Sequence, residues 1–109
     1  MQDALQVMTT TDTPEAARGL AALLVRRRLA ACVQVVGPIA STYWWEGQVE
    51  EAQEWLCVAK TRSERFAEVE QCIREQHAYD VPEIIAVPVS NISAPYLQWL
   101  QDTVPAVST

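Results

Sequence analysis

The chain has 109 residues and a formal charge of −6, from 14 acidic and 8 basic side chains. This length allows one domain, over residues 1–109, and an acidic chain repels phosphate backbones, so we expect no nucleic-acid partner. Three loosely spaced cysteines without a Cys-x-x-Cys pair exclude a zinc knuckle and favour a reducing compartment. Because neither a leader-like segment nor an apolar run of about 20 residues occurs, we expect a cytoplasmic protein that does not cross a membrane.

The first half of the chain predicts a strand, a helix and a long hairpin. Thr13 and Pro14 have the N-cap and first-turn preferences that open a helix, and apolar residues follow at helical spacing as far as Leu29. Glu46-Gly47 supplies a hairpin turn with a residue able to take positive φ. The expected elements are a strand over 4–10, a helix from Thr13, a strand over 31–36 that bends at Gly37-Pro38 and resumes over 39–45, and a return strand over 49–60.

The second half predicts a helix, a short strand and a last helix. Thr61 and Glu64 are spaced as a capping box, and the helix that follows should end near His77. A strand is expected over 84–87, a short helix after Ser93, and a frayed tail after Asp102. Two βαβ units around a hairpin indicate an α+β, ferredoxin-like βαββαβ sandwich with a long hairpin and a short C-terminal helix.

Both faces of the hairpin are apolar. In the return strand Trp55 and Cys57 alternate with Leu56 and Val58, whereas a sheet with helices on one face usually carries polar residues on the other. Two helices cover only one face, so we expect a second copy of the chain to cover the other in an obligate homo-oligomer. The alternative is that the last helix, with Trp99, folds back over this face.

Four segments in succession resemble the CutA divalent-cation-tolerance family. They are Arg28-Leu29-Ala30-Ala31-Cys32-Val33, Tyr43-Trp44-Trp45-Glu46-Gly47, Lys60-Thr61 and His77-Ala78-Tyr79-Asp80-Val81-Pro82-Glu83-Ile84. The resemblance extends over almost the whole chain. It implies a ferredoxin-like protomer and a tight homotrimer related in architecture to PII-type signalling proteins. It also implies a role in tolerance of divalent cations such as copper, without an established catalytic reaction.

A metal site is one hypothesis for the loop that follows the second helix. His77 is the only histidine, and Asp80 and Glu83 follow it three and six residues later. Imidazole and carboxylate ligands bind Cu²⁺ or Zn²⁺. We expect that the protein requires no cofactor. Alternatively, His77 caps the last carbonyls of its helix, and Glu83 forms an ordinary ion pair. Some bacterial relatives carry a cysteine where this chain has Thr9 and Thr10, so a privileged Cu(I) site is not expected.

A regulatory module is the competing hypothesis, in which a PII-like trimer binds a small organic ligand in clefts between subunits. The side chains that would line such a cleft are Cys32, Tyr43, Trp45, Lys60 and Tyr79. Packing is the alternative role for the aromatic residues, and Cys32 and Cys57 also fit buried core thiols. A purely structural trimer is a third hypothesis.

Two further features bear on function. Glu46, Glu50, Glu51 and Glu54 are interpreted as a solvated face at the hairpin tip. An enzyme is not expected, because the chain has a single histidine and no glycine-rich loop.

Overall fold

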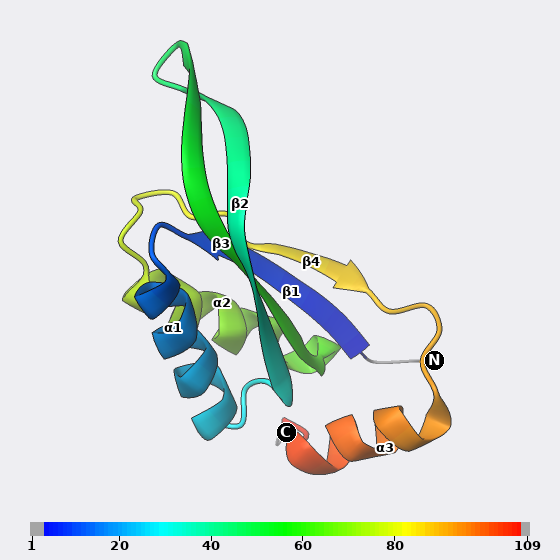
Figure 1. Cartoon of the computed structure of the whole chain (residues 1–109). Helices are drawn as coiled ribbons and strands as arrows, with labels where there is room; N and C mark the ends of the chain where they lie inside the picture. The colour runs from blue at the N-terminus through cyan, green and yellow to red at the C-terminus, as the bar shows by residue number, and fades with distance from the viewer. Residues whose placement is uncertain (1–3, 108–109) are drawn as a thin grey trace.

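Figure 1 shows a computed structural model, which describes residues 4–107. Within this range a four-stranded sheet has the order β2-β3-β1-β4, and all neighbouring strands are antiparallel. This is the α+β, ferredoxin-like arrangement that the sequence predicts, with a long β2–β3 hairpin. The elements are β1 (Ala4–Thr11), α1 (Pro14–Arg26), β2 (Cys32–Trp45), β3 (Gln48–Arg62), a 3₁₀ turn (Ser63–Arg65), α2 (Phe66–Gln76), β4 (Ile85–Pro88) and α3 (Ala94–Thr103).

The main core lies between the sheet and the helices α1 and α2, which cover the same face (Figure 1). Val7 of β1, Leu24 of α1 and Ile73 of α2 are each 1% exposed. These residues belong to the apolar stripes expected from the sequence, because a period of 3.6 in the helices and 2 in the strands turns them to one side. No helix among residues 4–107 is long and apolar enough to span a membrane.

One of the two predicted helix starts is confirmed, and the other is wrong. Thr13 is an N-cap, and its hydroxyl accepts a hydrogen bond from the amide of Ala16 at 3.0 Å. The prediction of a capping box at Thr61 and Glu64 is wrong. Thr61 is a buried residue of β3 whose hydroxyl donates to the carbonyl of Leu29 at 2.6 Å, because pairing with β1 extends the strand to Arg62.

The hairpin is regular except at one bulge and at its tip. The pairing of β2 with β3 shifts register between Val36 and Ile39, as the bend at Gly37-Pro38 predicts. A Cβ atom at Gly37 would collide with the indole of Trp55, so this close approach requires glycine. At the tip Glu46 and Gly47 have φ values of 50° and 80°, the left-handed conformation of a tight hairpin turn.

The outer face of the sheet, opposite α1 and α2, is only partly covered. At one end of the sheet, α3 buries Leu100 in a second cluster with Ala4 and Ala31. Trp99, which the alternative prediction placed over the outer face, is 44% exposed. Elsewhere Val36 of β2 and Val87 of β4 are 51% and 45% exposed. The last helix therefore covers part of this face with other residues, and the rest is open in the single chain.

The tail expected to fray after Asp102 is instead held in place as far as the structure describes it. Val104 is fully buried. The guanidinium of Arg62 donates to the carbonyls of Gln101 at 2.7 Å and Val104 at 2.5 Å, and that of Arg65 donates to Pro105 at 2.9 Å. Carbonyls at a helix C-terminus need such donors, and two arginines distant in sequence supply them.

Candidate functional site

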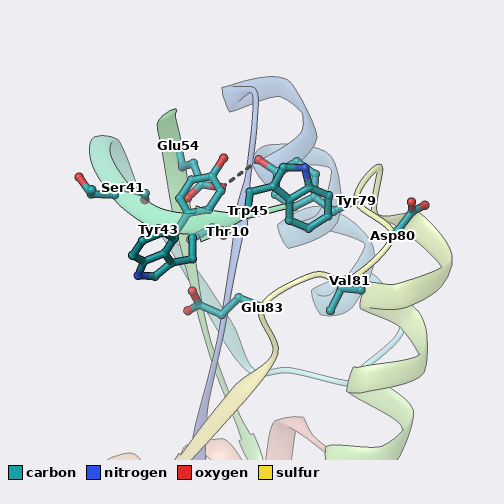
Figure 2. A pocket seen from close by; sticks show the side chains of 11 residues that line it. Thr10, Ser41, Tyr43, Trp45, Glu54, Tyr79, Asp80, Val81 and Glu83 are labelled. Atoms are coloured by element: carbon teal, nitrogen blue, oxygen red, sulfur yellow. Dashed lines mark hydrogen bonds between the residues drawn. The ribbon is translucent and has the colours of Figure 1, made fainter. Parts of the chain in front are cut away.

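A cavity of about 710 Å³ opens where the hairpin rises past the loop that joins α2 to β4. We call it the hairpin pocket. Figure 2 shows Tyr43, Trp45 and Tyr79 near Glu54, while the carboxylate of Asp80 points away from these rings. The residues that line it are Thr10, Ser41, Thr42, Tyr43, Trp44, Trp45, Glu54, Tyr79, Asp80, Val81 and Glu83.

Glu54 is the most enclosed charged residue of the hairpin pocket. It is 7% exposed, and its carboxylate accepts a hydrogen bond from the hydroxyl of Tyr79 at 2.9 Å. Burial raises the pKa of Tyr79, and the hydrogen bond to Glu54 and nearby negative charge raise it further. Glu54 was interpreted as part of a solvated face, which is wrong. The strand carries it away from the tip to the position directly before Trp55, which pairs with Thr11 at the end of β1.

His77 positions the loop beside the pocket. The amide of Tyr79 donates to Nδ1 at 3.1 Å, so the neutral ring carries its proton on Nε2, which donates to the carbonyl of Thr10 at 2.6 Å. The imidazole also contacts the Tyr79 ring, with 4.6 Å between centroids. The expected cap on the last carbonyls of α2 is therefore wrong, because the chain leaves the helix at His77 in an extended conformation.

The three residues proposed as metal ligands do not converge in one chain. Asp80 and Glu83 line the hairpin pocket, whereas His77 lies beside it with both nitrogens in hydrogen bonds. Among residues 4–107, no three histidine, cysteine, aspartate or glutamate side chains are placed to hold a metal ion. The ion pairs of this range do not include Glu83, so its expected pairing is absent there.

The five residues proposed for a ligand cleft separate into two groups. Tyr43, Trp45 and Tyr79 line the hairpin pocket. Cys32 and Lys60 are paired across β2 and β3 toward the other end of the sheet, where the Lys60 ammonium lies 5.9 Å from the ring centroid of Tyr96 on α3. Within a single chain, no common cleft among the described residues joins these groups.

The buried thiols fit a packing role. Cys57 is 1% exposed, and burial raises its pKa to about 11. Cys72 is 2% exposed, and burial likewise raises its pKa. Because the thiolate is the metal ligand and the nucleophile, neither group is prepared for that chemistry.

Sequence reasoning missed Glu54 as a pocket residue. The available signal was its position directly before Trp55-Leu56-Cys57, where the apolar part of the strand begins. A carboxylate at the start of a buried run differs from those at an exposed tip.

Known protein sequences include a family profile and individual proteins that are similar to this chain. The sequence profile of the CutA1 divalent ion tolerance protein family matches residues 5–103. The divalent-cation tolerance protein CutA of Archaeoglobus fulgidus is 40% identical over 98 residues, which are 90% of this chain and 95% of that protein. The rice protein CutA 1, chloroplastic, is 39% identical over 97 residues, 89% of this chain, and the match spans about half of its length, 55%.

A solved structure shows the same fold. The divalent cation tolerance protein Cut A1 from Thermus thermophilus superposes with a TM-score of 0.91 and 38% identity, covering 94% of this chain and 99% of the other. A family profile over nearly the whole chain, a relative matched along almost its full length and a close structural likeness agree. This chain belongs to the CutA1 divalent ion tolerance protein family.

Proposed function

We propose that the chain acts as a non-enzymatic homotrimer in tolerance of divalent cations. The open part of the outer face supports this assembly most directly. Val36 and Val87 are about half exposed there, Trp44 at the hairpin is 73% exposed, and the 14-residue strand β2 is an edge of the sheet. Large apolar surfaces and long free edges are typical of surfaces that a partner covers.

Analytical ultracentrifugation at micromolar concentration tests the trimer. We expect the mass of three chains for the wild type and a shift toward smaller species for Trp44→Ala, because truncating a packed aromatic ring in an interface commonly costs about 2 kcal/mol or more. Glu51→Ala, an exposed change on the same hairpin, is the control and should leave the mass unchanged. A folded wild-type monomer would refute the proposal.

Direct metal binding is proposed as weak and centred on Asp80 and Glu83. His77 joins them only if its ring gives up the bond to Thr10 or Tyr79. Oxygen ligands with one imidazole favour Cu²⁺ over Zn²⁺, and the threonines at the end of β1 give Cu(I) no soft ligand.

Competition with calibrated chelators checks this site. Cu²⁺ affinity should fall in Asp80→Asn and Glu83→Gln, and Asp102→Asn, an exposed carboxylate on α3, is the control. Tight Cu(I) binding by the wild type would contradict the site. The cytoplasmic location expected from the sequence stays a prediction.

The second candidate function is regulatory binding of a small organic ligand, which the hairpin pocket favours. Its volume of about 710 Å³ lies in the range, roughly 300–1,000 Å³, of small-molecule sites. Aromatic walls with a few convergent polar groups are also typical of such sites.

A further inference from the structure

We propose that the hairpin pocket binds a small organic cation whose ammonium or guanidinium group pairs with Glu54. This inference rests on the second candidate function and names the chemical class of its ligand.

The first argument for a cationic ligand is the charge balance of the pocket. Glu54 is 7% exposed, and its hydrogen bond within residues 4–107 comes from the neutral hydroxyl of Tyr79. No lysine, arginine or histidine is among the residues that line the pocket, and the ion pairs of the described range do not involve Glu54. A buried carboxylate without a positive partner is costly, and a cationic ligand removes that cost.

The second argument for a cationic ligand is the set of aromatic rings in the pocket wall. Figure 2 shows Tyr43, Trp45 and Tyr79 around the Glu54 carboxylate. Tyr43 and Trp45 are 43% and 49% exposed in the single chain, so packing within this chain does not fill the space beside their rings. The face of an aromatic ring attracts a cation, and a carboxylate beside such rings is a suitable setting for an organic ammonium group.

The same residues disfavour other ligands. Glu54, Asp80 and Glu83 would repel a phosphate or a carboxylate. A bare metal ion would be held only weakly, because no three ligand side chains among the described residues are placed together and ring faces do not replace them. The volume of the pocket leaves room for the apolar body of an organic molecule.

Titration calorimetry with three compounds of similar shape tests the ligand class. The probes are benzylamine as the cation, benzyl alcohol as the neutral compound and benzoate as the anion, each in EDTA to remove metal. We expect saturable binding of benzylamine alone. Glu54→Gln keeps the shape and removes the charge, and it should weaken that binding by about tenfold or more.

Two further variants separate a specific pocket from general acidity. Glu51→Gln removes the same charge from the same strand but lines no part of the hairpin pocket, and it should bind benzylamine like the wild type. Trp45→Leu removes an aromatic wall and should also weaken binding. It tests the proposal even if Glu54→Gln does not fold.

The outcomes are distinct. Binding of benzoate or benzyl alcohol as tight as that of benzylamine would overturn the ligand class and leave the organic-ligand function standing. An equal loss in Glu51→Gln would overturn the pairing with Glu54. Failure of all three probes to bind the folded wild type would overturn the ligand class and also remove the support for the second candidate function, whereas the trimer is judged separately by its mass.

Discussion

The two faces of the sheet carry similar apolar residues in very different surroundings. On the inner face Val7 and Ala59 are 1% and 2% exposed, whereas on the outer face Val36 and Val87 are about half exposed. Both helical crossovers are right-handed in such a topology and place α1 and α2 on the same side. An apolar face on a strand therefore predicts that the face is buried. The chain topology decides whether helices of the same chain or a second chain bury it.

The largest expected difference between the faces is in the cost of truncation. Leu24→Ala should lower the free energy of unfolding by about 2–5 kcal/mol, because the side chain is 1% exposed and its removal leaves a cavity. Val87→Ala is the matched change on the outer face. Its cost should appear mainly as destabilisation on dilution, because a second copy covers Val87 in the proposed trimer.

Denaturant unfolding at several protein concentrations measures both effects. The two variants could instead lose the same unfolding free energy at every protein concentration. The outer face would then be closed within the single chain, and the proposed difference between the two faces would be wrong.

A smaller effect is expected where α3 covers the outer face. Arg62→Ala removes charged donors from the carbonyls of Gln101 and Val104, and should cost about 2 kcal/mol, as for a hydrogen bond to a charged group. The tail should also become more sensitive to proteolysis. Arg74→Ala is the control, since Arg74 is an exposed partner of Glu70 at 3.5 Å, and such pairs contribute about 0.5 kcal/mol or less. Equal costs for the two variants would show that the tail is held by other contacts.

The last effect appears only at alkaline pH and concerns a thiol on the inner face. Burial raises the pKa of Cys57 from 9.0 to about 11, so the folded chain keeps a proton that the unfolded chain releases. This contribution to stability is complete below about pH 9 and is lost as the pH rises toward about 11. The unfolding free energy of the wild type should therefore fall more steeply over this range than that of Cys57→Ala. Parallel curves would show that the thiol is more solvated than its position on the inner face indicates.

Local pattern was sufficient for most of the fold. The Thr13 cap, the Glu46-Gly47 turn, the bulge at Gly37-Pro38 and the apolar stripe of α1 depend on residues close in sequence. Such features follow from capping, turn and periodicity preferences. The capping box at Thr61 failed because strand pairing outweighed a local preference.

The site depended on contacts between distant segments. Tyr43, Trp45 and Tyr79 were proposed as cleft residues of a PII-like trimer, and one pocket of the single chain contains all three. The ring nitrogens of His77 are bonded to Thr10, 67 residues away, and to Tyr79, so its role required the packed loop. Glu54 likewise became a buried partner of Tyr79 only when β1 and the loop closed around β3.

The sequence by itself determined the order and type of the elements, because hydrophobic period and capping act over a few residues. It also identified a doubly apolar hairpin. Only the tertiary structure decided which apolar face the helices cover, that Arg62 and Arg65 hold the tail, and that Lys60 lies apart from Tyr43. The reason is physical: these outcomes depend on chain crossovers and strand register, which bring together groups that no local pattern connects.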